Sequence, residues 1–430
     1  MLLINPWIYD FAAVNMWSRP LGLLKVAEFL SAYDVDLGLV DCMEAGITKR
    51  YGCGSYPKEV VEKPECLRAV PRKYSRYGIT LEEFTRAVTS RSRPDLVFMT
   101  SLMSYWYPGV QSAVEVVRKV HGGVPVILGG IYASLWSRHA AGTSGADGVY
   151  KGPVGAELMF LLRTFGFRMK RKGKERPHHS LGLYKHYPFT AILTSTGCPY
   201  DCDYCASGQL TGGFSRRPTG DIVGEITDLH DMGIRDIAFY DDALLAEAEG
   251  NIKVVLKKVI ERGLDLRFHC PNGLHARFVD DELAYLMRRS GFKTLRLGLE
   301  TVDGGRQFST GGKVTSGEIE RAVTLLKRQG FTKDEIGIYL MHGLPGQGLE
   351  EVRNGVSFLR SLGVRIHLTE FSPIPGTRCW DELLSRGIIT DAIDPLLTNN
   401  AVFHYLFADY DHGELEKLRL DVKGYNRESA

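Results

Sequence analysis

Short apolar runs alternate with helix-like stretches along about the first 165 residues of the chain. The longer stretches carry apolar residues every three to four positions, which predicts helices between buried strands. Pro20 to Ala32, for example, places Leu21, Leu24 and Leu30 on one helical face and has a proline in its first turn. This alternation predicts an α/β domain with a doubly wound parallel sheet of the Rossmann or flavodoxin-like kind. The predicted strands are Leu2–Asn5, Val35–Asp41, Asp95–Ser101, Pro125–Leu128 and Gly148–Tyr150.

A second series of strands and helices runs from Ala191 to Pro373 and repeats six times. Six units are two short of a closed (β/α)8 barrel of the TIM type. Functional residues of such barrels lie at the C-terminal ends of the strands. The predicted strands are Ala191–Ser195, Asp236–Tyr240, Leu266–Cys270, Thr294–Leu299, Ile336–Met341 and Ile366–Phe371.

These two series define the predicted domains. Residues 1–166 form the doubly wound domain, 167–190 a basic linker, 191–375 the barrel and 376–430 a C-terminal extension. One long polar segment, residues 49–81, interrupts the first series. It is predicted either as a functional loop or as a plain surface excursion.

Composition narrows the function classes. The chain has 430 residues, 44% apolar content and a net charge of +2, which disfavours nucleic acid and anionic membranes as partners. No apolar run is long enough for a membrane span, and the first residues look like a strand rather than a signal peptide. Eight cysteines are too few for a disulfide scaffold. We therefore expect a cytoplasmic protein.

Three cysteines follow the first strand of the second series with the spacing CxxxCxxC. They are Cys198, Cys202 and Cys205. Three thiolates on one tight loop can hold three irons of a [4Fe–4S] cluster and leave the fourth iron without a protein ligand. The alternatives are a zinc site completed by His269 or Cys270, or three unrelated core cysteines. A structural zinc site needs four protein ligands.

This motif, with the aromatic Tyr204 before its last cysteine, resembles that of the radical S-adenosylmethionine (SAM) superfamily. The resemblance implies that SAM binds the open iron of the [4Fe–4S] cluster and is cleaved by one electron to a 5′-deoxyadenosyl radical. It also implies that the six units form the family's open, partial (β/α)6 barrel of the TIM type, and that an electron donor such as a flavodoxin or ferredoxin is needed.

The same resemblance implies SAM contacts where the strands end. Asp241 and Asp242 follow the second strand, where the family often carries a glutamate, and either could accept from the SAM ammonium. Glu300 follows the fourth strand, and Gly343 and Pro345 lie after the fifth, in the segment that contacts adenine in the family. Tyr204 completes the predicted SAM residues.

The carboxylates among these residues have structural alternatives. An aspartate of the pair could cap the next helix, and Glu300 could form a salt bridge to Arg277 or Arg296. The glycine-rich Gly311-Gly312-Lys313 lacks the spacing of a phosphate-binding loop and is predicted as a turn.

A doubly wound domain ahead of such a barrel resembles the cobalamin-binding subgroup of the superfamily. Its loop after the first strand, residues 5–15, has no cobalt-ligating histidine, so the lower face of cobalt would meet Met103, Tyr105, Trp106 or Tyr107. A flavodoxin-like domain without cobalamin is the alternative. The residues that the resemblance places at the cobalamin are Pro20, Leu21, Ser101, Met103, Tyr105, Gly129 and Gly130.

The resemblance to this subgroup implies an enzyme that methylates an unactivated carbon through methylcobalamin. Rearrangement or cyclisation without methyl transfer is the first alternative, and a non-catalytic iron–sulfur sensor or scaffold is the second. By elimination we expect a small-molecule substrate and no nucleic acid.

Overall fold

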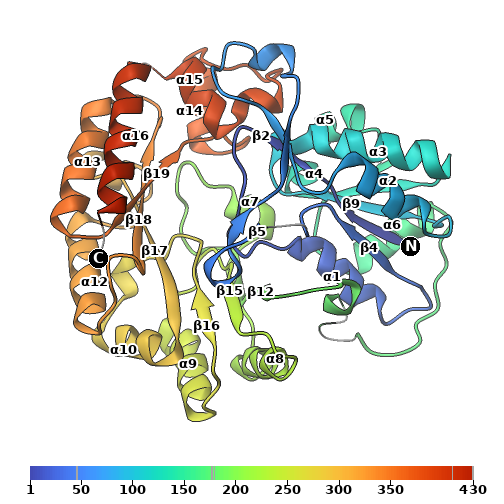
Figure 1. Ribbon diagram of the computed structural model, residues 1–430, viewed down its shortest axis with the longest axis horizontal. Coiled ribbons are helices and arrows are strands. Elements are labelled where there is room, and N and C mark those ends of the chain that lie inside the picture. Colours follow the sequence, from blue (N-terminus) through green and yellow to red (C-terminus); the bar gives the residue numbers. More distant parts are fainter. Residues whose placement is uncertain (45–46, 176–177, 179, 409, 429–430) are drawn as a thin grey trace. The chain divides into compact units, whose positions relative to one another are not determined.

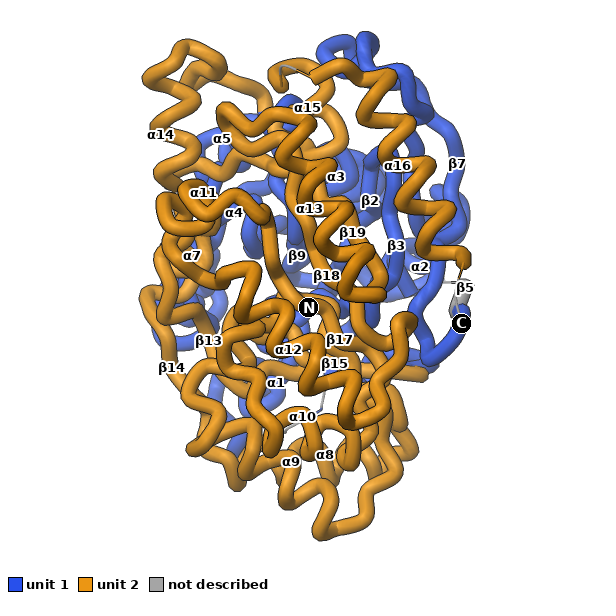
Figure 2. Tube along the Cα trace, turned by 90° about the vertical axis from the view of Figure 1, so that its left-hand side faces the viewer, with its two compact units in different colours: residues 1–187, 395–397 blue, residues 188–394, 398–430 orange. Residues whose placement is uncertain are grey.

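The structure is a computed structural model that describes residues 1–44, 47–175, 178, 180–408 and 410–428 (Figure 1). The chain divides into two compact units. Unit 1 comprises residues 1–187 with 395–397, and unit 2 comprises residues 188–394 with 398–430 (Figure 2). No helix in the described part of the chain combines the length and apolar character needed to cross a membrane.

Unit 1 is built on a five-stranded parallel sheet in the order β11-β10-β9-β1-β4. Numbered along the chain, this is the flavodoxin-like order 2-1-3-4-5, and the direction of winding reverses between β1 and β9. The prediction of an α/β fold with a parallel sheet is confirmed. The strands are β1 (Leu2–Asn5), β4 (Gly38–Asp41), β9 (Val97–Ser101), β10 (Val126–Gly130) and β11 (Gly148–Val149).

Both faces of this sheet are apolar and buried. Leu3, Phe98 and Ile127 pack in the core shared with α1 (Leu21–Leu30) and α6 (Ala156–Thr164). Residues next to them in the strands are buried on the opposite face, as is typical of a sheet covered on both sides. The remaining helices of the unit are α2 (Leu81–Thr89), α3 (Tyr107–His121), α4 (Ile131–Leu135) and α5 (Ser137–Thr143).

The long segment 49–81 is ordered by pairing with the chain that follows β1. It contributes strands to two small antiparallel sheets, β2-β8-β7 and β3-β6-β5. Trp7 anchors this region, since its Nε1 donates to Ile79 O at 2.6 Å. The strands are β2 (Ile8–Asp10), β3 (Val14–Asn15), β5 (Ile47–Thr48), β6 (Gly54–Ser55), β7 (Lys58–Val60) and β8 (Ser75–Tyr77).

Residues 167–187, which fall in the predicted linker, group with unit 1. Phe167 and Tyr184 pack against its core. The Tyr184 hydroxyl donates to Asp41 Oδ2 at 2.8 Å, and Lys172 N donates to Ala32 O at 2.7 Å. Apolar burial and these hydrogen bonds therefore hold the basic segment on the unit.

Unit 2 contains a six-stranded parallel sheet whose strands follow chain order, β12-β15-β16-β17-β18-β19. A short antiparallel pair, β13 (Ser195–Thr196) with β14 (Ser215–Arg216), leads into and out of the cysteine loop. The strands of the large sheet are β12 (Phe189–Ile192), β15 (Asp236–Phe239), β16 (Arg267–His269), β17 (Phe292–Glu300), β18 (Ile336–His342) and β19 (Arg365–Glu370).

The two faces of the β17–β19 part of the sheet differ in chemistry. Leu295, Leu297 and Leu340 belong to the apolar row, and Leu340 packs so closely on α13 that a Cβ on Gly355 would lie 2.7 Å from it. The alternate positions include glycines and half-buried polar residues, among them Tyr339, which pairs with His367 in register. The helices of unit 2 are α7 (Ser207–Thr211), α8 (Thr219–Asp231), α9 (Ile252–Glu261), α10 (Asp281–Ser290), α11 (Gly304–Ser309), α12 (Ser316–Arg328), α13 (Leu349–Ser361), α14 (Arg378–Ser385), α15 (Asn400–Phe407) and α16 (His412–Arg427).

The first predicted barrel strand, Ala191–Ser195, is shorter than expected. It ends at Ile192 because Asp241 Oδ1 accepts hydrogen bonds from the backbone N–H of Thr194 and Ser195, at 2.9 and 2.6 Å. A buried carboxylate thus takes donors that would otherwise continue the ladder.

The C-terminal helix α16 covers the edge strand of the large sheet and runs beside β19 in Figure 1. Asn426 on this helix pairs with the free edge: its Nδ2 donates to Ile366 O at 2.7 Å, and its Oδ1 accepts from Ile366 N at 3.0 Å. The side-chain amide replaces a missing strand and blocks pairing by another chain at this position.

Replacing Asn426 with Ala should expose the edge of β19. Loss of the acceptor for Ile366 N is expected to lower its local protection by about 1 kcal/mol, so that its amide exchanges about five-fold faster. Hydrogen–deuterium exchange of β19 measures this. Lys423→Ala, on an exposed position of the same helix, is the control. Equal exchange in both variants would contradict the role of Asn426.

Candidate active site

The three cysteines of the CxxxCxxC motif lie together on the loop between β13 and α7. All three are free thiols; Cys205 acts electrostatically on Cys198 and Cys202, and Cys198 acts on Cys202. The loop turns tightly, with Cys205 N donating to Cys202 O at 3.0 Å. Burial raises the pKa of the Cys198 and Cys202 thiols, that of Cys202 to about 11, so metal binding here would have to displace protons.

Glycine is required at the start of this loop. Gly197 has a φ of +73°, and a Cβ there would lie 2.1 Å from Gly213 O. The close approach of the two backbone segments around β13 and β14 therefore excludes any side chain at this position.

The chain after the predicted barrel clamps the cysteine loop from outside. Arg378 at the start of α14 binds Asp203 Oδ1, Asp201 Oδ2 and Asp201 O, and Cys379 N donates to Asp203 O at 2.9 Å. Gln209 Nε2 donates to Gly376 O at 2.6 Å. A segment distant in sequence therefore restrains both the backbone and the two acidic side chains of the motif.

The two aspartates after β15 have different surroundings. Asp241 is buried, and its Oδ1 accepts four hydrogen bonds from the backbone and hydroxyls of Thr194 and Ser195. Its Oδ2 has no hydrogen-bond partner among the described residues. Asp242 accepts from Ser207 Oγ at 2.5 Å and acts electrostatically on Cys198 and Cys205. Asp241 thus organises the approach to the cysteine loop, whereas Asp242 lies close to the thiols.

Glu300 at the end of β17 has a left-handed backbone, with a φ of +66°. Its Oε1 lies 3.2 Å from Lys313 Nζ. Arg277, one of the two alternative partners considered for Glu300, instead binds Gly312 O and Glu318. Such strain in a non-glycine residue is typical of functional sites.

Beside Cys198 lies a stack of aromatic and cationic side chains. His275 Nε2 lies 4.0 Å from Cys198 Sγ, and the imidazole stacks on Tyr200 with 4.9 Å between ring centroids. The guanidinium carbon of Arg277 lies over the Tyr200 ring, 5.5 Å from its centroid. Burial, with Lys313 and Arg277, lowers the pKa of His275 to about 3, so the imidazole is neutral.

The residues considered as a fourth zinc ligand have other contacts. His269 bonds Asp236 and Thr294, each at 3.0 Å, and Cys270 is fully buried. Among the residues that the structure describes, no three His, Cys, Asp or Glu side chains are grouped to hold a single metal ion.

The loop after β18 is held by the C-terminal extension. Gly343 has a φ of +85°, its N–H donates to the Tyr410 hydroxyl at 2.9 Å, and a Cβ on it would lie 3.2 Å from His404 Cβ. Pro345 O accepts from Arg306 Nη1 at 3.0 Å. Sequence analysis missed Tyr410, because nothing in the local pattern after residue 377 relates it to this loop.

A buried polar network lies next to this loop. His342 ends β18, and its ring meets that of His404 at 89° with 5.0 Å between centroids. Arg419 of α16 binds Glu370 and approaches both imidazoles at 3.4 and 3.5 Å. Burial, His404 and Arg419 lower the pKa of His342 to about 2. The network fastens the extension to β18 and β19.

In unit 1 five of the predicted cobalamin residues lie at or just after the ends of β9 and β10: Ser101, Met103, Tyr105, Gly129 and Gly130. Ser101 Oγ donates to Met103 O at 2.9 Å, and the Met103 side chain is 39% exposed. A Cβ on Gly130 would lie 2.5 Å from Thr100 Oγ1, whereas Gly129 has no contact closer than 3.8 Å. A side chain on Gly130 would therefore collide with β9, whereas a Cβ on Gly129 would meet Tyr150 O at ordinary van der Waals distance.

The other unit 1 candidates differ in exposure. Tyr105 is buried, and Pro20 and Leu21 form the start of α1. Of the residues considered for the lower face of cobalt, Trp106 donates to Asp10 Oδ2 at 2.7 Å and Tyr107 is buried in a stack on Tyr132. Of Met103, Tyr105, Trp106 and Tyr107, only Met103 is exposed.

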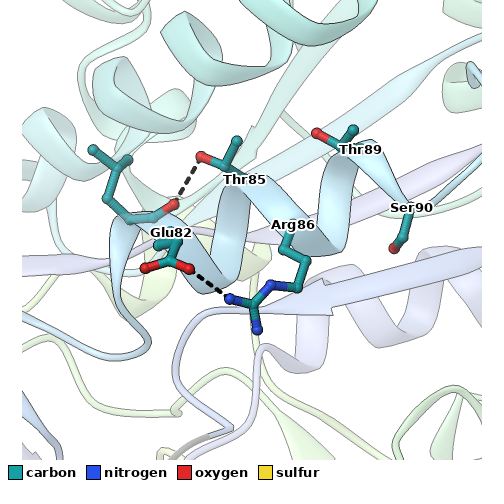
Figure 3. Close-up of a pocket in the computed structure, with 6 residues that line it drawn as sticks. Glu82, Thr85, Arg86, Thr89 and Ser90 are labelled. Atoms are coloured by element: carbon teal, nitrogen blue, oxygen red, sulfur yellow. Dashed lines mark hydrogen bonds and ion pairs between the residues drawn. The ribbon is translucent and has the colours of Figure 1, made fainter.

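A surface pocket of unit 1 lies elsewhere. It is lined by one side of α2, including Thr85 and the ion-paired Glu82 and Arg86 (Figure 3). It contains none of the predicted site residues, and its lining belongs to a solvent-facing helix.

Comparison with known proteins extends this description. Residues 192–359 match the family model of the radical SAM superfamily. An uncharacterized methyltransferase of Pyrococcus horikoshii is 24% identical over 333 residues, which are 69% of this chain and 71% of the relative. Tryptophan 2-C-methyltransferase of Streptomyces laurentii is 24% identical over 213 residues, 46% of this chain and 34% of the relative.

Solved structures of the radical SAM methyltransferase TsrM from Kitasatospora setae resemble this chain. The structure with cobalamin and a [4Fe–4S] cluster bound has a TM-score of 0.65 and 17% identity, and covers 91% of this chain and 76% of TsrM. A second TsrM structure, with tryptophan and a SAM analog, has a TM-score of 0.66, 17% identity and coverage of 90% and 76%. The resemblance to the radical SAM superfamily, and with it the prediction of a radical SAM enzyme, is confirmed.

Removal of the Arg378 clamp should loosen the cysteine loop. In the metal-free protein, Arg378→Ala is expected to make Cys202, 8% exposed in the native fold, react about two- to five-fold faster with iodoacetamide. Mass spectrometry of the alkylated peptide measures the rate. Arg386→Ala is the matched control, since that arginine pairs with Glu382 on the same helix. An unchanged rate for Arg378→Ala would show that the loop holds its shape without the clamp.

Proposed function

We propose that this chain, in which residues 192–359 match the radical SAM family, is a cobalamin-dependent radical SAM methyltransferase that methylates an unactivated carbon of a small molecule. The observation that carries the proposal is the position of three free thiols on one tight loop that follows a strand of a parallel sheet, where Asp242, Glu300 and Lys313 act electrostatically on them. Three thiolates are the ligand set of a cluster with an open iron.

Cys198, Cys202 and Cys205 would hold the [4Fe–4S] cluster. SAM would lie against Tyr204 and the strand ends. Of the two aspartates, Asp242 is favoured as acceptor for the SAM ammonium, because Asp241 Oδ1 is already occupied by four donors and Asp242 acts on the thiols. Glu300 would bind a ribose hydroxyl, and the loop with Gly343 and Pro345 would contact adenine.

Unit 1 would bind cobalamin. Its flavodoxin-like strand order puts a switch point between β1 and β9, where ligands of such sheets bind. Gly129, where a Cβ would meet nothing closer than 3.8 Å, and the exposed Met103 at these strand ends support the proposal. TsrM, which shares the fold, has cobalamin bound. On this basis residues 1–166 act as a B12-binding domain and 191–375 as a partial (β/α)6 barrel.

When bound, the cluster, SAM and cobalamin supply the radical and methyl-transfer chemistry. The residues of this chain bind and orient these groups and keep their charges in place. A flavodoxin or ferredoxin is proposed as the electron donor. The relatives named as methyltransferases favour methylation over rearrangement.

Cys202→Ala should abolish both cluster assembly and SAM cleavage. Two cysteines cannot hold the three irons that the site requires. Iron and sulfide content after anaerobic reconstitution, together with release of 5′-deoxyadenosine, measure the effect. Cys66→Ala, an exposed cysteine of unit 1, is the control and should behave as the wild type. Full iron content in Cys202→Ala would contradict the assignment.

The product of the reaction tests the proposal as a whole. Reduced protein, reconstituted with cobalamin and incubated anaerobically with SAM and candidate small molecules, should give a product heavier by one CH2. 5′-Deoxyadenosine and S-adenosylhomocysteine should form with it, as measured by mass spectrometry. Product of unchanged mass would indicate rearrangement or cyclisation. No cleavage of SAM by cluster-loaded protein would indicate a non-catalytic sensor. Absence of corrinoid absorption bands from the reconstituted protein would exclude cobalamin as a cofactor.

A further inference from the structure

The segment Gly311-Gly312-Lys313 is shaped to approach the cysteine loop. Gly311 and Gly312 have φ values of +105° and +58°. A Cβ on Gly311 would lie 3.0 Å from Asp201 O and 3.1 Å from Cys202 Cα, and Arg277 donates to Gly312 O at 2.5 Å. The sequence predicts only a turn here, but the backbone contact brings Lys313 to the thiols.

The Lys313 ammonium lies in a confined place. Its side chain is 16% exposed and that of Glu300, 3.2 Å away, is 13% exposed. Gly298 on β17 leaves room for both, because a Cβ there would lie 2.9 Å from Lys313 Nζ and from Glu300 Oε1. An unpaired ammonium would be costly at this site, so the charges around it decide its stability.

Glu300 and the cysteine loop both act electrostatically on Lys313. Burial alone would lower the pKa of Lys313, but Glu300, Cys202 and Cys205 outweigh it and raise that pKa. In return Lys313 opposes the effect of burial on the pKa of each of the three cysteines. Lys313 therefore stays an ammonium at neutral pH, and its field acts on all three cysteines.

We propose that the Lys313 ammonium is the resident counter-charge of the cluster and raises its reduction potential. This rests on the proposed function, because it requires a cluster at the three cysteines. One-electron reduction adds a negative charge to a group that thiolates already make negative, and a nearby buried cation stabilises the reduced form. Glu300 acts in the opposite sense and offsets part of the effect.

A purely structural role for Lys313, as the counter-ion of Glu300, makes a different prediction. In that case substitution of either partner would leave the other charge buried and unpaired, and both variants would lose stability or iron. A direct effect on the cluster moves its potential in opposite directions for the two substitutions. The sign of the shift therefore separates the two roles.

The test is a redox titration of anaerobically reconstituted protein without SAM, followed by electron paramagnetic resonance of the reduced cluster. Lys313→Met should lower the midpoint potential, Lys313→Arg should keep it near the wild-type value, and Glu300→Gln should raise it. Lys258→Met, which removes a surface charge paired with Glu261 in the same unit, is the control and should not shift it. Iron and sulfide content are measured for every variant.

Unchanged potential in fully loaded Lys313→Met, or shifts of the same sign in Lys313→Met and Glu300→Gln, would overturn the inference. If Lys313→Met does not assemble a cluster, the change in midpoint potential of Glu300→Gln tests the inference: a rise supports it, and a fall or no change overturns it. A wild-type protein that holds no cluster would instead refute the proposed function, which keeps the two failures distinct.

Discussion

The parallel alignment of the strands is the constraint on which the candidate site depends. Because every strand of a parallel sheet has the same direction, the residues after β12, β15, β17 and β18 all emerge at one edge. Cysteines, carboxylates and a glycine-rich loop separated by more than a hundred residues are thereby brought to the same side of unit 2. The apolar rows of these strands pack against helices and leave the polar positions available for chemistry.

Charge balance around the cysteine loop is the second theme of the structure. The motif carries Asp201 and Asp203, and Arg378 forms ion pairs with both of them. Glu300 and Lys313 form the corresponding pair near the thiols. The ion pairs of Arg378 are screened by solvent, so their effect is mainly on the geometry of the cysteine loop. Glu300 and Lys313 are shielded from water, so their charges act on the cysteines themselves.

The C-terminal extension caps the free edge of the large sheet and holds the loop after β18. Asn426 satisfies the free edge of β19, Arg419 joins Glu370 to two imidazoles, and Tyr410 receives the N–H of Gly343. Each contact links a residue after 398 to the last two strands. The loop with Gly343 and Pro345 therefore owes its shape to a part of the chain without a motif of its own.

The sequence by itself determined the alternation of strands and helices, the parallel sheets and the cysteine motif, because hydrophobic periodicity and residue spacing are local properties. It also indicated the carboxylates at strand ends, since position after an apolar strand is visible in one dimension. Only the tertiary structure decided the partners: Lys313 for Glu300, Arg378 for the acidic motif, and Tyr410 for Gly343. These contacts join residues far apart in the chain, so they depend on three-dimensional packing that no local pattern encodes.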